Sequence, residues 1–388
     1  MFNHEDVRID LLKKWSHNLR WAVVPDGVIP LTAADPDFGA ASPIREALER
    51  YARDGHFGYG PPEGLESFRE SMSAHYAGTR QVHVPADRIL PVDSAAFGIL
   101  LICRTMLKPG DEAIIFDPVD FLFRYSVETV GATAVPLTLP QGVPFNPEAM
   151  EASVTPKTRM ICLCNPLNPT GKVFSRQELL QLAEVARRHD LTILSDEIWS
   201  DIVFKPFQFT SIASLAPEIA ARTITVTGFS KSYGLAALRI GAVLSPDAHI
   251  HARLLEASLH HATVHGANVP GQVAAQAALD ECGGWLESFV HHLHRMRDLT
   301  VDRLNGIKGF RCVAPQGCYV AFADIRNTGL TSAEVHQRLM DSARVAVVPG
   351  LPKWFGQGAD GFIRISFATS VANMEEAMDR MTREFGTA

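Results

Sequence analysis

One lysine in the sequence stands in a setting that favours covalent chemistry. Lys231 follows the apolar run Thr223–Thr227, and no other charged residue occurs between it and Arg239. Burial disfavours the charged form of an amine, so we expect the pKa of Lys231 to be lowered. A neutral amine can condense with a carbonyl compound to form a Schiff base near neutral pH. The alternative is a surface lysine on a loop, but the surrounding glycines and small residues favour a close approach of the backbone to a ligand.

Polar side chains follow four of the predicted strands directly. They are Asp93 with Ser94, Asn165, Asp196, and Ser230 with Lys231. In an open parallel sheet, ligands bind outside the carboxyl ends of the strands. We therefore expect these side chains to form the floor of a single ligand site.

The residues Ser94, Ala95 and Ala96 begin a predicted helix directly after a strand. The free amides and the dipole of a helix N-terminus attract an anion such as phosphate. The hydroxyl of Ser230 and the guanidinium of Arg239 could reach the same anion, because the arginine fork suits planar charge pairing. These residues predict a phosphate site, although Ser94 would also serve as an ordinary helix N-cap.

Short apolar runs alternate with helical patterns through the middle of the chain, which is typical of βαβ units around a largely parallel sheet. Helices are expected at Ser94–Leu107 and at Ser175–His189, the second opened by a capping box. From about residue 280 the pattern changes to a helix, Trp285–Leu304, followed by strand-like stretches at Val313–Asp324 and Phe362–Phe367, which indicates a smaller α+β domain. Strands of the larger domain are expected at Arg88–Val92, Ala113–Phe116, Thr133–Leu137, Arg159–Cys164, Thr192–Ser195, Thr223–Thr227 and Ile240–Leu244.

A chain of 388 residues suits two domains rather than one core. We expect a large domain at 46–279 and a small domain formed by 1–45 together with 280–388. The formal charge of −7 argues against a nucleic-acid partner. No apolar run of membrane-spanning length occurs and the first residues are polar, so no membrane association and a cytoplasmic location are expected. The cysteines and histidines lack ligand spacing, and we expect no metal site.

Four motifs resemble the class I/II aminotransferase superfamily, the fold-type I pyridoxal-phosphate enzymes. They are Ser230-Lys231 with Arg239, the segment Asn165-Pro-Leu-Asn-Pro-Thr-Gly171, the segment Ser195-Asp-Glu-Ile-Trp-Ser-Asp201, and Phe362-Ile-Arg-Ile-Ser366. Their order and spacing fit the family over essentially the whole chain. The resemblance implies an α/β fold with a mostly parallel seven-stranded sheet flanked by helices, plus a smaller α+β domain. It also implies pyridoxal 5′-phosphate as the cofactor.

The resemblance implies a role for each motif residue. Lys231 would hold the cofactor as an internal aldimine, and Asp196 would keep the pyridine nitrogen protonated. Asn165 would hydrogen-bond the phenolic oxygen, and Trp199 would also contact the cofactor. Arg364 would bind the substrate α-carboxylate as a bidentate pair, beside the backbone of Ala34.

The segment around Tyr59 resembles the one whose tyrosine crosses a dimer interface to the phosphate of the neighbouring subunit, which implies a homodimer. Tyr59 would equally fit an aromatic residue of a turn. The family usually places an aromatic ring over the pyridine two residues after Pro118, where this chain has Asp120. We expect Phe121 to take over the stacking, or the pocket to be reshaped.

The reaction itself stays open at this level. After an external aldimine forms, Lys231 can remove the Cα proton as a general base, and the carbanion can lead to transamination, β-elimination or decarboxylation. The stretches Lys14-Trp15, Ala34-Asp35 and His56–Tyr59, with Trp199, resemble the cystathionine β-lyase-like C–S lyases, whereas Arg239 and Arg364 resemble aminotransferases. We expect an aminotransferase acting on an α-amino acid as its small-molecule substrate, with the C–S lyase or a specialised decarboxylating or eliminating biosynthetic enzyme as alternatives. A PLP-sensing regulator is disfavoured, because the chain has no spare basic DNA-binding module.

Overall fold

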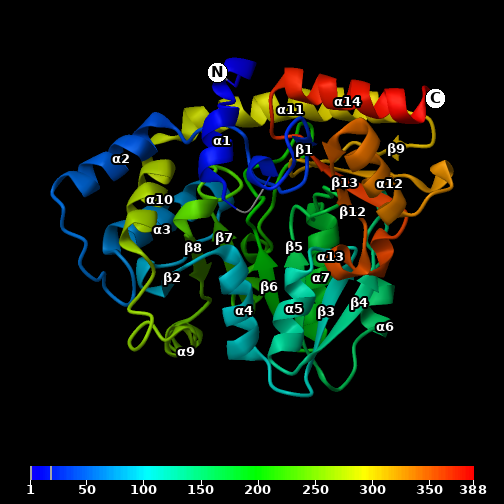
Figure 1. Cartoon of the computed structure of the whole chain (residues 1–388). Coiled ribbons are helices and arrows are strands. Elements are labelled where there is room, and N and C mark those ends of the chain that lie inside the picture. Colours follow the sequence, from blue (N-terminus) through cyan, green and yellow to red (C-terminus); the bar gives the residue numbers. More distant parts are fainter. Residues whose placement is uncertain (1, 18–19) are drawn as a thin grey trace.

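A seven-stranded sheet forms the centre of the larger part of the molecule in the computed structural model, which describes residues 2–17 and 20–388 (Figure 1). The only antiparallel pairs in this sheet are those that β8 makes with β2 and β7, and its other neighbours run parallel. In spatial order the strands are β2 (Ile89–Val92), β8 (Gly241–Leu244), β7 (Thr223–Gly228), β6 (Thr192–Asp196), β5 (Thr158–Cys164), β3 (Glu112–Asp117) and β4 (Thr133–Thr138). The seven strands expected from the sequence are confirmed, each to within one residue at either end.

The strands of this sheet are apolar because helices cover both of its faces. In β5 the residues from Met160 to Cys164 are all buried, including the thiols of Cys162 and Cys164. Such continuous apolar runs are typical of parallel strands that pack on both sides. The helices of this part are α2 (Ser42–Arg53), α3 (Glu66–Arg80), α4 (Ala95–Met106), α5 (Leu122–Thr129), α6 (Pro147–Ala152), α7 (Arg176–Arg188), α8 (Pro217–Ala220), α9 (Ala248–Ser258) and α10 (Val269–Glu281).

Two of the expected helix starts are formed by local hydrogen bonds. The hydroxyl of Ser94 accepts a bond from the backbone N–H of Phe97 at 3.1 Å and caps α4. Ser175 and Glu178 form the expected capping box at the start of α7. These caps fix where each helix begins relative to the strand before it.

A second, four-stranded sheet lies in the C-terminal part of the chain. Its order is β12 (Val348–Pro349), β13 (Phe362–Ser366), β10 (Val320–Asp324) and β9 (Arg311–Cys312). The stretch expected as one strand from Val313 to Asp324 is instead a loop up to Tyr319, because Pro315 cannot donate to a ladder and Cys318 has a positive φ of 65°. The helices here are α11 (Gly283–Asn305), α12 (Ser332–Arg338), α13 (Pro352–Phe355) and α14 (Val371–Phe385).

The beginning of the chain joins this C-terminal part. After α1 (Ile9–Trp15), β1 (Ile29–Pro30) pairs in parallel with β11 (Val345–Ala346). The N-terminal segment, α11 and α14 lie together at one end of the molecule (Figure 1). On this basis we propose the division into a small domain of 1–45 with 280–388 and a large domain of 46–279.

The part of the chain that the structure describes contains neither a membrane-spanning helix nor a metal-ligand cluster. Within 2–17 and 20–388, no helix is long and apolar enough to cross a membrane. In the same ranges, no group of three or more His, Cys, Asp or Glu side chains is placed to hold a metal ion.

Candidate active site

A cavity of about 330 Å³ lies at the carboxyl ends of the parallel strands, beside the small sheet. It is lined by residues from distant parts of the chain, as the position of polar side chains after strands predicts. The sequence-predicted residues that line it are Ala34, Ser94, Ala95, Ala96, Asp196, Trp199, Ser230, Lys231, Arg239 and Arg364. The fold therefore brings together residues that are up to 330 positions apart in the sequence (from 34 to 364).

Lys231 points its amine across the cavity. Its Nζ donates a hydrogen bond to the backbone carbonyl of Ala34 at 2.7 Å and lies 5.5 Å from the ring centroid of Trp199. Burial lowers the pKa of Lys231, as predicted, while nearby carboxylates such as Asp35 oppose the shift. An amine of lowered pKa inside a cavity is suited to imine chemistry.

Tyr319 holds the other side of the same carbonyl, although the sequence analysis did not single it out. Its hydroxyl donates to the oxygen of Ala34 at 3.1 Å, and its ring meets Trp199 edge-to-face at 4.7 Å. Tyr319 is fully buried. It therefore fixes the segment that faces the lysine. Its burial and its hydroxyl partner appear only in the folded chain, so the sequence carries no signal for this role.

The N-terminus of α4 lines the cavity and has the groups that bind an anion. Arg239 Nη2 donates to the hydroxyl of Ser94 at 2.9 Å, next to the free amides of Ala95 and Ala96. Gly241 lets β8 pass close to the start of α4, because a Cβ at position 241 would lie only 2.8 Å from the backbone nitrogen of Ala95. The free amides, the hydroxyl and the guanidinium together match a phosphate group.

Asp196 is the last residue of β6 and lines the cavity. Its Oδ1 accepts a hydrogen bond from the backbone N–H of Ile198 at 3.1 Å. Burial raises the pKa of the Asp196 carboxyl to about 7. A cationic N–H group placed beside it would favour the ionised form, since an opposite charge lowers a carboxyl pKa.

Arg364, on β13, also lines the cavity. Its Nη1 donates to Oδ1 of Asn168 and its Nη2 to the carbonyl of Thr32, both at 3.2 Å. Its Nε is buried and has no hydrogen-bond partner within residues 2–17 and 20–388. A buried guanidinium with an unused donor is poised to accept a carboxylate.

Asn165 does not line the cavity, in contrast to its predicted contact with the cofactor. Its side chain accepts from the backbone N–H of Phe174 at 3.1 Å and donates to the carbonyl of Thr210 at 3.4 Å, so it ties the following loop in place. The loop turns back on itself, and its second asparagine, Asn168, lines the cavity instead. Both asparagines precede a proline, so the local sequence does not distinguish them.

Phe121 does not line the cavity either. Its ring is 38 % exposed and packs edge-to-face on Trp354 at 5.6 Å, while Leu122 and Phe123 contribute to the cavity wall. Its backbone N–H bonds to the carbonyl of Trp354, which directs the residue toward α13. The stacking role expected for Phe121 is therefore not supported by this geometry.

Tyr59 lies outside the cavity of its own chain. Its side chain is 88 % exposed and contacts the ring of His265 at 4.9 Å. Its neighbour Phe57 is 65 % exposed. Two large exposed aromatic residues on one segment are a feature of interaction surfaces.

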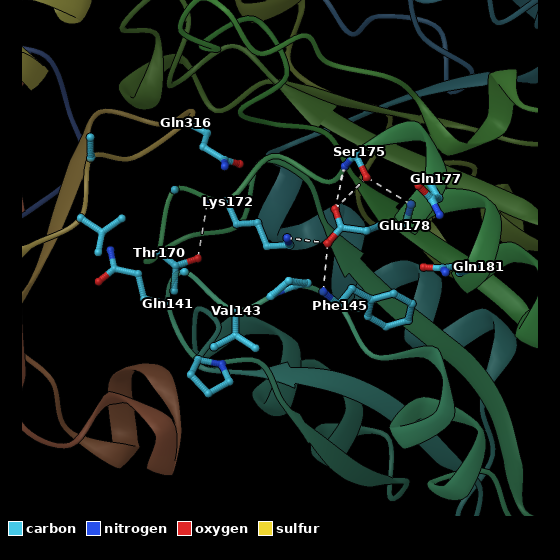
Figure 2. A pocket seen from close by; sticks show the side chains of 16 residues that line it. Gln141, Val143, Phe145, Thr170, Lys172, Ser175, Gln177, Glu178, Gln181 and Gln316 are labelled. Carbon is cyan, nitrogen blue, oxygen red and sulfur yellow. Dashed lines mark hydrogen bonds and ion pairs between the residues drawn. The ribbon is translucent and has the colours of Figure 1, made fainter.

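A larger cavity of about 540 Å³ lies elsewhere, between the loop 140–145 and the start of α7. Its ionisable groups are already paired. Figure 2 shows Lys172 and Glu178 pointing at each other, with Nζ and Oε1 2.7 Å apart, and the Glu178 carboxylate also accepts from the backbone of Phe145 and Ser175. These bonds serve the helix cap and the loop, so we place the chemistry in the smaller cavity.

Comparison with known proteins agrees with this site. The model of the aminotransferase class I and II family matches residues 26–381, so the chain belongs to that family. It is an enzyme of the pyridoxal-phosphate-dependent class, and the residues above fit the cofactor: an anion cradle, a buried lysine and a buried carboxylate line one cavity.

Individual relatives are similar over nearly their whole length. The chain is 33 % identical to an aspartate aminotransferase of Pyrococcus abyssi, covering 92 % of this chain and 91 % of the relative. The crystal structure of an aromatic aminotransferase from Pyrococcus horikoshii superposes with a TM-score of 0.86 at 31 % identity, covering 93 % and 96 % of the two chains. Cystalysin from Treponema denticola reaches a TM-score of 0.87 at 22 % identity, covering 97 % and 94 %, and shows the shared fold alone.

Proposed function

We propose that this enzyme transfers the amino group of an α-amino acid, with Lys231 as the residue that binds the cofactor and moves the Cα proton. The observation that carries the proposal is that these groups line one cavity. It holds the anion cradle of Ser94 and Arg239, the buried Lys231 and Asp196, and Arg364 with its unused Nε.

Each residue has a defined task in this proposal. Pyridoxal phosphate supplies, when bound, an electron sink for the pair of electrons left at Cα. Ser94, Ser230, Arg239 and the amides of Ala95 and Ala96 would bind the phosphate. The Asp196 carboxylate would accept a hydrogen bond from the ring N–H, and Asn168 rather than Asn165 would face the phenolic oxygen.

On the substrate side, Arg364 would bind the α-carboxylate through two parallel hydrogen bonds. Lys231 Nζ, once released by the substrate amine, would take the proton from Cα as a general base and return it at the end of the reaction. Burial lowers the pKa of Lys231, which favours the uncharged amine that a base requires. The carbonyl of Ala34, which Lys231 contacts at 2.7 Å, orients the amine toward the cavity.

The reaction type is tested by its need for an acceptor. Purified enzyme incubated with a panel of amino acids, including cysteine conjugates, is expected to form keto acid only when an amino acceptor such as 2-oxoglutarate is present. Formation of pyruvate and ammonia without acceptor would assign β-elimination instead. Acceptor-independent release of carbon dioxide would assign decarboxylation.

A homodimer is the second part of the proposal, because exposed Tyr59 would reach the phosphate of the partner subunit. Sedimentation is expected to give twice the mass of one chain. Tyr59→Phe is expected to weaken cofactor binding about 5- to 10-fold, the loss of one ordinary hydrogen bond of roughly 1 to 1.5 kcal/mol. Tyr125→Phe, a change at another exposed tyrosine, is the control. A fully active monomer would contradict this arrangement.

A further inference from the structure

One charged group of the cavity has no partner in the reaction as proposed. Asp120 follows β3 and stands two residues after Pro118. Its Oδ2 accepts from Nδ2 of Asn168 at 2.9 Å and its Oδ1 from the backbone N–H of Leu122 at 3.2 Å. The side chain is partly exposed because it lines the cavity, yet it lies deep enough that burial raises the pKa of its carboxyl.

The charged groups that line the cavity can be assigned one by one. The cations are Lys231, Arg239 and Arg364, and the carboxylates are Asp120 and Asp196. In the proposed function Arg239 meets the phosphate, Lys231 the aldehyde, Arg364 the substrate carboxylate, and Asp196 the ring nitrogen. No cation is left for Asp120.

The rest of the chain does not provide one either. Within residues 2–17 and 20–388, Asp120 forms no ion pair with a lysine, arginine or histidine. Arg364 and Lys231 are near enough to favour its ionised form. In the proposed function, however, a substrate carboxylate would neutralise the guanidinium, and Lys231 would be bound to the cofactor or act as an uncharged base. An ionised carboxylate at this depth is stabilised by a cation, and in the proposed function that cation would enter with the ligand.

We propose that Asp120 is a specificity-determining residue that binds a cationic side-chain group of the substrate, so that the enzyme acts on amino acids with basic side chains. The inference rests on the proposed function and names its substrate class. Only two arginines, Arg239 and Arg364, line the described cavity, so this chain offers no further guanidinium there for the second carboxylate of an acidic substrate.

Asn168 determines where the cationic group would lie. Its amide bonds to Arg364 through the oxygen and to Asp120 through the nitrogen. The α-carboxylate and the side-chain cation would therefore bind on either side of a single amide group.

Matched pairs of amino acids that differ only in the terminal group test the proposal. The pairs are 2,3-diaminopropionate with serine, 2,4-diaminobutyrate with homoserine, ornithine with 5-hydroxynorvaline, and lysine with 6-hydroxynorleucine. Dissociation constants are measured from the absorbance change of the cofactor-loaded enzyme with the α-methyl form of each compound, which binds but has no Cα proton to lose. Wild-type enzyme is expected to prefer the ammonium member of at least one pair by about 10- to 100-fold, as a charge-assisted hydrogen bond implies.

Asp120→Asn is expected to reduce that preference to within about two-fold, because the amide keeps the size but not the charge. Both members of a pair carry the same α-carboxylate. The ratio of their dissociation constants is therefore unaffected by a change in α-carboxylate binding that movement of Asn168 or Arg364 would cause. Asp120→Glu keeps the charge and is expected to keep a preference, shifted to a different chain length. Glu375→Gln removes a charge at an exposed position on α14 and is expected to leave the ratio unchanged.

Two results would overturn the proposal: equal binding of both members of every pair by the wild-type enzyme, or an ammonium preference that persists in Asp120→Asn. Borohydride reduction separates these failures from a failure of the proposed function. Cofactor that becomes fixed to Lys231 without any ammonium preference refutes the role of Asp120 alone. An enzyme that fixes no cofactor refutes the proposed function itself.

Discussion

Replacement of Lys231 by alanine is expected to lower the rate of Cα-proton removal by about 10²- to 10⁴-fold, the usual contribution of a positioned general base. The rate is measured as exchange of the substrate α-hydrogen in deuterated water. Borohydride treatment of the wild-type enzyme is expected to attach the cofactor to the peptide that contains Lys231, and the variant should give no such label. The physical reason is that Lys231 is the lysine whose amine lines the cavity.

A matched control and a rescue separate chemistry from folding. Lys308→Ala removes an exposed lysine outside the cavity and is expected to leave exchange and labelling unchanged. Added methylamine is expected to restore part of the exchange rate in Lys231→Ala, because a free amine can enter the space and act as the base. Wild-type exchange in the variant, or a label on another lysine, would remove Lys231 from the mechanism.

The second large effect is expected at Arg364. Arg364→Gln should lower kcat/KM roughly 30- to several-thousand-fold, since truncating one partner of a buried charge pair costs about 2 to 5 kcal/mol. Most of the loss should appear as a higher KM, because Arg364 would bind the α-carboxylate equally strongly in the substrate complex and in the transition state. Arg364→Lys keeps the charge but not the bidentate fork and is expected to give an intermediate loss.

The test of this assignment uses a ligand without the carboxylate. The amine that corresponds to the decarboxylated substrate should bind the wild type and Arg364→Gln equally, whereas the amino acid should bind the variant more weakly. Arg311→Lys, at an exposed arginine of the same small sheet, is the control. An unchanged kcat/KM for the amino acid in Arg364→Gln would show that its carboxylate binds elsewhere.

The two asparagines of the loop after β5 show how far local sequence can resolve a site. The segment Asn165-Pro-Leu-Asn-Pro-Thr-Gly171 predicted an asparagine at the cofactor, and the structure places Asn168, not Asn165, in the cavity wall. Which asparagine faces the cavity depends on which side chain already forms hydrogen bonds with the protein. Asn165 is engaged by Phe174 and Thr210, and these contacts exist only after the loop has folded back.

The aromatic residue at position 121 illustrates a second limit. The absence of a ring at position 120 was visible in the sequence, and Phe121 was the nearest replacement. Its direction depends on α13, which is more than two hundred residues later in the chain and provides the carbonyl of Trp354 that its N–H contacts. Neighbouring positions in such a turn point in different directions, and no local pattern shows which one faces a cavity.

Periodicity and strand-end positions were sufficient for the α/β fold, the seven strands, the caps of α4 and α7, and the grouping of Lys231, Asp196 and Ser94. These features follow from short-range rules: a buried parallel strand must be apolar, and its carboxyl end is where a polar side chain meets a ligand. The unused Nε of Arg364, the carbonyl shared by Lys231 and Tyr319, and the lone carboxylate of Asp120 required the folded chain. Each depends on contacts between segments far apart in the sequence, and the free energy of such contacts has no local signature.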